Sequence, residues 1–143
     1  MPGRPLSETS SGAGVTIGID TSVVVRLLVG EPAAQARAAR ARLERALEER
    51  ETVLVCDIVV AEAYFALHHH YGVPKEEARQ LLSDFLTSGV VEADPPEVVH
   101  ALATRRGAGL VDRLVHVRYR SRGAITRTFE RKQAALEGAE RIR

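Results

Sequence analysis

Short runs of β-branched residues alternate along this chain with longer stretches that have the hydrophobic spacing of helices. Residues 15–19 and 52–56 are runs of this kind, and they predict buried strands. Residues 33–50 are rich in alanine and place Leu43 and Leu47 four positions apart, which predicts an amphipathic helix. Strands that alternate with helices form parallel sheets covered on both faces. We therefore expect an α/β fold of three layers, α/β/α, with a central and mostly parallel sheet.

Capping and helix-breaking residues set the expected limits of the other elements. Asp20, Thr21 and Ser22 can cap a helix over residues 23–29, and Gly30 can end it. We expect a helix over residues 58–71 capped by Asp57, a helix begun by Pro74, and a brief strand at Val90 and Val91.

The remaining elements are expected in the C-terminal part of the chain. A helix should run from a capping box at Asp94-Pro95-Pro96-Glu97 to about Arg106, and another should carry Asp112 and run to about Arg120. After these we expect a strand over residues 124–129, a helical segment after Arg131 and an edge strand over residues 140–142.

The length of the chain and the position of its Gly-, Ser- and Pro-rich segment indicate one domain. Residues 1–14 are rich in Gly, Ser and Pro and predict a flexible N-terminal tail, and residues 15–143 predict a single domain. No apolar run approaches the roughly 20 residues that a membrane-spanning helix needs, and the first residues lack the apolar core of a secretory signal. The only cysteine, Cys56, excludes an internal disulfide. We expect a cytoplasmic protein.

Basic residues gather in the last third of the chain. Residues 101–143 hold 11 Lys and Arg but only 4 acids, a balance of +7, whereas residues 1–100 have a balance of −6. Basic density of this kind attracts phosphate backbones. A solvated helix face would have the same composition, so the charge alone leaves both interpretations open.

Three carboxylates stand in apolar surroundings far apart in the sequence. Glu62 is the only charged residue between Ile58 and Leu67, Asp20 ends an apolar run, and Asp112 interrupts another. An ionised carboxylate on an apolar face needs a partner or a cation, and hard cations prefer carboxylate oxygens. The three acids therefore predict one shared divalent-metal site. We expect it beyond the carboxyl ends of the strands, where Glu130 also follows a predicted strand.

Each acid also has a structural interpretation when it is taken alone. Asp20 fits a helix cap, Glu62 fits a salt bridge to a nearby arginine, and Asp112 has an arginine beside it. The three consecutive histidines at residues 68–70 make a poor metal cluster, because successive helical residues point in different directions. We expect a structural or solvated role for these histidines.

Three of the acids lie within longer motifs. The motifs read Ile-Asp-Thr-Ser-Val-Val-Val-Arg-Leu-Leu at residues 19–28, Val-Cys-Asp-Ile-Val-Val-Ala-Glu-Ala-Tyr-Phe-Ala-Leu at residues 55–67, and Thr-Phe-Glu-Arg at residues 128–131. These segments resemble PIN domains, most closely the VapC-like toxins of type II toxin–antitoxin pairs. The resemblance covers residues 15–142. It implies a PIN-like fold, with a parallel sheet between helices, and metal-dependent endoribonuclease activity.

The resemblance also implies roles for particular residues. Asp20, Glu62 and Asp112 match the first three acids of the family, and they are expected to hold Mg²⁺ or Mn²⁺. Glu130 matches the fourth catalytic acid, which is usually Asp. The implied partners are an RNA substrate, a small antitoxin protein and a second copy of the chain. The hydroxyl residues matched to the family, which would orient phosphate or carboxylate groups, are Thr21, Ser22 and Thr128.

Four arginines in the basic segment are candidates for binding RNA phosphates. Each is also a candidate for an ordinary solvated surface charge. They are Arg113, Arg118, Arg127 and Arg131.

Two other functions fit the sequence. The first is a catalytically silent PIN-like module that binds RNA or a partner protein, because Gly109 and Arg113 alter the third motif and Glu130 the fourth. The second is a phosphohydrolase with Asp20 as nucleophile, although such enzymes normally carry another Asp where Ser22 stands. Metal affinity separates an active nuclease from the silent module.

Overall fold

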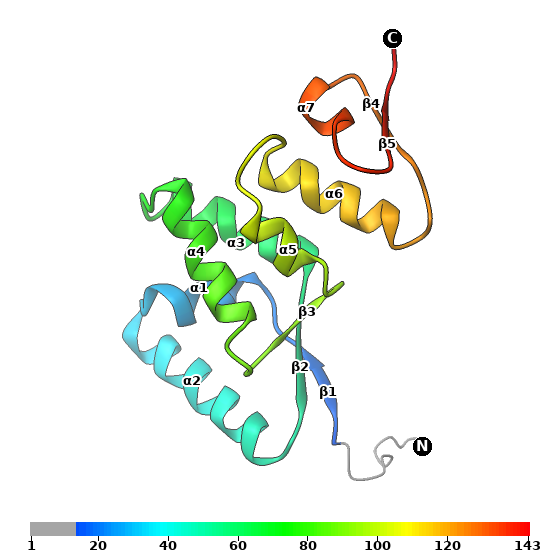
Figure 1. Cartoon of the computed structure of the whole chain (residues 1–143). Helices are drawn as coiled ribbons and strands as arrows, with labels where there is room; N and C mark the ends of the chain where they lie inside the picture. The colour runs from blue at the N-terminus through cyan, green and yellow to red at the C-terminus, as the bar shows by residue number, and fades with distance from the viewer. Residues whose placement is uncertain (1–13) are drawn as a thin grey trace.

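Three parallel strands form the centre of the computed structural model, which describes residues 14–143 (Figure 1). These strands are β1 (Thr16–Gly18), β2 (Thr52–Cys56) and β3 (Glu92–Asp94). Their order is β1-β2-β3, and both pairings are parallel. Val53 and Val55 of β2 are buried, as is Ala93, which lies opposite Val55. The central strand is buried because a parallel sheet carries helices on its faces.

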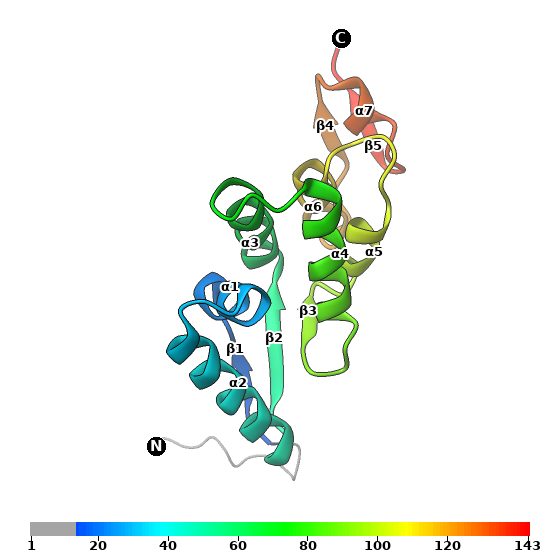
Figure 2. The same cartoon turned by 90° about the vertical axis from the view of Figure 1, so that its left-hand side faces the viewer.

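Five helices surround this sheet: α1 (Thr21–Val29), α2 (Ala33–Glu48), α3 (Asp57–His69), α4 (Lys75–Leu86) and α5 (Val98–Ala103). In Figure 2, α1 and α2 lie on the β1 side of the sheet, and α4 and α5 lie on the β3 side. The core between them is aliphatic, and Val24, Val60, Leu67, Leu82 and Leu102 are fully buried. The expected α/β architecture is therefore confirmed.

The limits of α1 follow from its capping residues. Asp20 has extended backbone and accepts hydrogen bonds from the main-chain N–H groups of Ser22 and Val23. Gly30 ends the helix with φ at 83°, a left-handed conformation that costs glycine little because it lacks a Cβ. The predicted start and end of this helix are confirmed.

The C-terminal third of the chain forms a separate layer. Its elements are α6 (Leu110–Arg120), β4 (Thr126–Thr128), α7 (Arg131–Ala134) and β5 (Ala139–Arg141). Helix α6 packs against α3 and α5. The strands β4 and β5 form their own two-stranded parallel sheet, and both views place it well away from β1 (Figures 1 and 2).

Two expectations about local structure are wrong. The third strand spans Glu92–Asp94 rather than Val90 and Val91, because Ser88 accepts a hydrogen bond from Val90 N–H within a turn. The expected capping box before α5 does not form: Glu97 makes no side-chain cap hydrogen bond. Helix α5 is consequently shorter than the sequence suggests.

The tail predicted for residues 1–14 lies, apart from Gly14, outside the described residues. Across residues 14–143, no helix has the length and the apolar composition that crossing a membrane requires.

Candidate functional site

Asp20 stands at the carboxyl end of β1, where the chain turns into α1. Its Oδ1 accepts hydrogen bonds from Ser22 N–H at 3.0 Å, from the Ser22 hydroxyl at 2.6 Å and from Val23 N–H at 3.3 Å. These bonds, led by that of the Ser22 hydroxyl, lower the pKa of the Asp20 carboxyl below its usual 3.8. The carboxylate is exposed and stays ionised at neutral pH.

Glu62 faces the same first turn of α1 from the middle of α3. The Thr21 hydroxyl donates a hydrogen bond of 2.6 Å to Glu62 Oε1. The expectation that this acid lies on a buried apolar face is wrong, because Glu62 is exposed although its helical neighbours Val60 and Ala63 are buried. The structure thus brings Glu62 to Thr21, the residue next to Asp20.

Asp112 belongs to α6 and lies beside the C-terminal half of α3, away from Glu62. It is half-buried in the first turn of α6 and lines a cavity of about 280 Å³ together with His68, His69 and Lys75. Glu62 lines two other cavities. The carbonyl oxygen of Asp112 accepts a hydrogen bond from the Gln133 side chain.

Glu130 follows β4 in the second sheet. Its main-chain N–H donates to the Thr128 hydroxyl at 2.9 Å, within the turn that follows β4. The ligand-orienting role that the family resemblance implies for this hydroxyl stays a prediction. The Glu130 side chain is exposed. Because β4 is absent from the sheet of β1, Glu130 does not stand beside Asp20 at one sheet edge as the sequence led us to expect.

The acids of one chain do not form a three-ligand metal site. Among residues 14–143, no group of three His, Cys, Asp or Glu side chains is arranged to hold a metal ion. The histidines at residues 68–70 form no such group either, and His68 Nδ1 lies 2.9 Å from the carbonyl oxygen of Val73. The donor set described here therefore does not fit the expected cation within a single chain.

Two of the four candidate arginines are committed to protein contacts. Arg118 makes two hydrogen bonds, of 2.8 and 2.5 Å, to the carboxylate of Asp57. Arg113 donates to the main-chain carbonyl groups of Arg106 and Ala108 and so holds the loop before α6. The other two are exposed, as Arg118 also is: Arg127 forms a surface ion pair with Glu140, and Arg131 opens α7.

Asp57 is the buried carboxylate that sequence reasoning missed. It is the first residue of α3 rather than its cap, and only 4% of its surface is exposed. Its hydrogen bonds and charge raise the pKa of Arg118, and the pair fastens α6 to the end of β2. The available signal was its place directly after a buried strand and before four apolar residues.

An apolar groove runs between α3 and α6. It has a volume of about 360 Å³ and carries Glu62 on its rim. Its lining includes Ile58, Val111, Val115 and Tyr119, all of which keep at least two fifths of their surface exposed. Exposed apolar residues gathered in this way are typical of contact surfaces.

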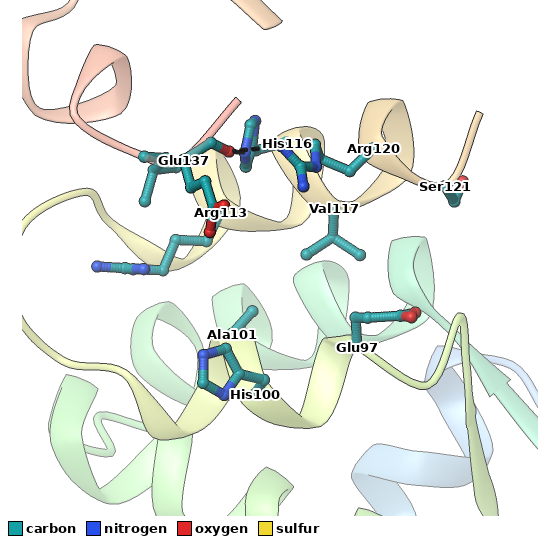
Figure 3. Close-up of a pocket in the computed structure, with 10 residues that line it drawn as sticks. Glu97, His100, Ala101, Arg113, His116, Val117, Arg120, Ser121 and Glu137 are labelled. Carbon is teal, nitrogen blue, oxygen red and sulfur yellow. Dashed lines mark hydrogen bonds between the residues drawn. The ribbon is translucent and has the colours of Figure 1, made fainter. Parts of the chain in front are cut away.

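A further cavity, of about 540 Å³, lies between α5 and α6 (Figure 3). It contains none of the four predicted acids. His116 Nε2 lies 2.7 Å from the Glu137 carbonyl oxygen, to which Arg120 also donates. These bonds hold the segment before β5 against α6, so these polar groups of the cavity stabilise the packing of the C-terminal segment.

Comparison with known proteins identifies one family. Residues 17–138 match the PIN domain, and the α/β architecture of the structure is consistent with a PIN-like α/β/α fold. No curated protein and no solved structure matches the chain.

Proposed function

Because this chain belongs to the PIN domain family, whose members are generally nucleases, we propose that it is an endoribonuclease that requires Mg²⁺ or Mn²⁺. The observation that carries the proposal is the meeting of the first two family motifs, where Thr21 donates to Glu62 beside Asp20. The two acids stand beyond the carboxyl end of a parallel strand, the usual place of a ligand site in such sheets.

The charge of Asp20 fits metal-dependent chemistry better than proton transfer. Asp20 has a lowered pKa and remains a carboxylate, which suits a metal ligand and disfavours a general acid. Since residues 14–143 of one chain bring no third carboxylate, histidine or cysteine to this place, the further ligands of the ion would come from outside these residues.

RNA is the proposed substrate. The basic balance of residues 101–143 supports a polyanionic ligand, and Arg127 and Arg131 are the exposed candidates for contact with its phosphates. Arg113 and Arg118 support this role less, because both donate hydrogen bonds within the fold.

A nuclease assay tests the proposal. Purified protein is incubated with a panel of structured RNAs in Mg²⁺, in Mn²⁺ and in EDTA. We expect cleavage in either metal, none in EDTA, and background cleavage by Glu62→Gln. The matched control is Glu44→Gln, the same charge change at an exposed position of α2, which should cleave as wild type does. Equal cleavage in EDTA, or full activity of Glu62→Gln, would contradict the proposal.

We further propose that the chain is the toxin of a toxin–antitoxin pair and acts in the cytoplasm. The apolar groove between α3 and α6, with Glu62 on its rim, supports control by a small protein that covers the acids. Induced expression should arrest the growth of a bacterial host, and Glu62→Gln should relieve the arrest. Normal growth with soluble wild-type protein would argue against the toxin role.

A catalytically silent PIN-like module is the second candidate. The lack of a three-ligand metal group among residues 14–143 favours it. Thermal unfolding with and without Mn²⁺ separates the two candidates, because a ligand that binds only the folded state raises its stability. We expect Mn²⁺ to raise the Tm of the wild type, whereas a silent module would show no shift.

A further inference from the structure

The outer edge of β1 carries main-chain groups that no strand among residues 14–143 pairs with. Thr52 N–H donates to the Val15 carbonyl, and Ile19 N–H donates to the Leu54 carbonyl, so Val15 and Ile19 direct these groups toward β2. Alternate residues of a strand in a parallel pair face opposite sides. Thr16 and Gly18 therefore present their N–H and C=O groups at the outer edge, which can receive a further strand.

Strand β4 has a matching edge. Thr126 N–H donates to the Gly138 carbonyl, and Ile142 N–H donates to the Thr128 carbonyl, so these two threonines face β5. By the same alternation Arg127 directs its main-chain groups away from β5. A two-stranded sheet of three residues per strand is marginally stable by itself. Both parallel sheets thus end in an unpaired edge within the described part of the chain.

Apolar side chains beside both edges are exposed to solvent. Val15 next to β1, and Ile125 and Phe129 on either side of β4, each expose more than half of their surface, and Phe129 exposes 68%. Parallel sheets are normally buried on both faces. Joining the two edges would remove this apolar surface from water as well as pairing the main-chain groups.

The β4–β5 sheet is held away from β1 of its own chain. His116 lies 2.7 Å from the Thr126 hydroxyl and from the Glu137 carbonyl oxygen, which fixes the sheet to α6. The ion pair of Arg118 with buried Asp57 then fixes α6 to α3. Pairing of β4 with β1 in the same chain would require these contacts to break, whereas pairing with β1 of a second copy would not require it.

We infer that two copies of this chain exchange edges, so that β4 of each pairs in parallel with β1 of the other. Because each copy both gives a β4 edge and receives one, the reciprocal exchange closes into a dimer with two-fold symmetry. Each half contains a continuous parallel sheet in the order β3-β2-β1 followed by β4 and β5 of the second copy.

The exchange also supplies an acid to the candidate site, and this part of the inference rests on the proposed function. Asp20 lies two residues beyond the end of β1, and Glu130 lies two residues beyond the end of β4. Neighbouring strands are about 4.8 Å apart. Alignment of the strand ends therefore sets Glu130 of the second copy beside Asp20, and a site that is incomplete in one chain gains a third carboxylate.

The mass of the full chain in solution tests the exchange. Light scattering after gel filtration should give about twice the monomer mass of 15.6 kDa. Thr16→Pro removes a main-chain donor from the outer edge of β1 and should give monomers, while Thr16→Ala keeps that donor and should stay dimeric. Arg127→Pro and Arg127→Ala form the same matched pair on β4. A monomeric wild type, or folded proline variants that remain dimeric, would overturn the exchange.

Amide hydrogen exchange tests whether two copies pair β4 with β1, even if both proline variants fail to fold. The N–H groups of Gly18 and Arg127 should be protected in the wild-type protein, because each is hydrogen-bonded across the exchanged edge. Exchange of both amides at the rate of unpaired groups would also overturn the inference.

Complementation tests the shared site. Asp20→Asn and Glu130→Gln should each be inactive alone, whereas their co-expression gives mixed dimers with one intact site and should restore about a quarter of wild-type cleavage. A dimeric but inactive mixture would show that the acids do not combine across chains. If the wild type itself cleaves no RNA, the proposed function fails, and the mass and hydrogen-exchange results still decide whether edges are exchanged.

Discussion

Asp20 caps α1 and, under the proposed function, is also a charged metal ligand. Its Oδ1 accepts the hydrogen bonds that begin the helix. An asparagine side chain offers the same acceptor without the charge. The two roles can therefore be measured in different variants.

Asp20→Ala should lower the free energy of unfolding by about 1 kcal/mol, since it removes a helix cap. Asp20→Asn should stay close to wild type in stability while it loses nuclease activity. Urea unfolding of both variants, beside the cleavage assay, checks the separation. Equal destabilisation by both substitutions would show that the charge and not the cap supports the fold.

The same carboxylate makes the stability of α1 depend on pH in acid. The pKa of Asp20 is lower in the folded chain than its usual 3.8, chiefly because the Ser22 hydroxyl donates to it. A group with a lowered folded pKa contributes stability that is complete above the unfolded pKa and is lost as pH falls through the folded value. Thermal unfolding between pH 5 and pH 2 should show a smaller loss of Tm in Asp20→Asn than in wild type; parallel curves would contradict this assignment.

Thr21 should orient Glu62 through its hydroxyl. Thr21→Val keeps the shape of the side chain but removes the donor, and removal of a residue that orients a metal ligand typically costs about 10- to 100-fold in activity. Thr21→Ser retains a hydroxyl and should keep most of the activity. Cleavage rates of the two variants give the comparison, and equal rates would assign Thr21 no orienting role.

At the scale of the elements, one buried arginine joins α4 to the end of α5. Arg79 is 5% exposed and donates to the main-chain carbonyl groups of Ala101, Leu102 and Thr104. Burial lowers the pKa of its guanidinium. The three carbonyl groups offset the desolvation of the charge and receive the donors that the end of a helix lacks.

Arg79→Met should destabilise the protein by about 2–4 kcal/mol, because it leaves buried carbonyl groups without partners. Arg45→Ala is the control, since it removes an exposed ion pair with Glu49 and should change stability by less than about 1 kcal/mol. Denaturant unfolding of both variants tests the difference. A tolerated Arg79→Met would mean that water satisfies these carbonyl groups.

Most elements could be predicted from the sequence because their signals are local. Strand β2 can be predicted from its run of β-branched residues alone, and the limits of α1 can be predicted from Asp20 and Gly30. The position of β3 depends on which residues pair with Leu54 to Cys56, a long-range choice that local patterns do not encode. For the same reason, the sequence could not show that β4 leaves the sheet of β1.

The sequence predicted the candidate site only where its residues lie within a motif. The Thr21–Glu62 contact lies within the first two motifs that the sequence identified. The apolar neighbours of Glu62 suggested burial, yet they belong to other faces of α3. The role of Asp57 depended on Arg118, which is 61 residues away, so no local pattern could reveal it.

At the scale of the whole molecule, the chain divides into an acidic part and a basic part. Asp20 and Glu62 belong to the acidic residues 1–100, whereas Glu130 and the exposed arginines belong to the basic residues 101–143. The proposed exchange places the basic part of one copy next to the acids of the other. RNA would then be bound and cleaved at a site that two chains share.

Crystals of the wild-type protein soaked in Mn²⁺ show directly whether Asp20 and Glu62 hold a metal ion, because manganese is located by its anomalous scattering. We expect one peak per chain, bonded at about 2.1 Å to the carboxylates of Asp20 and Glu62. Well-diffracting crystals without a peak there, or with manganese bound only at the histidines of residues 68–70, would rule out a metal site at these two acids.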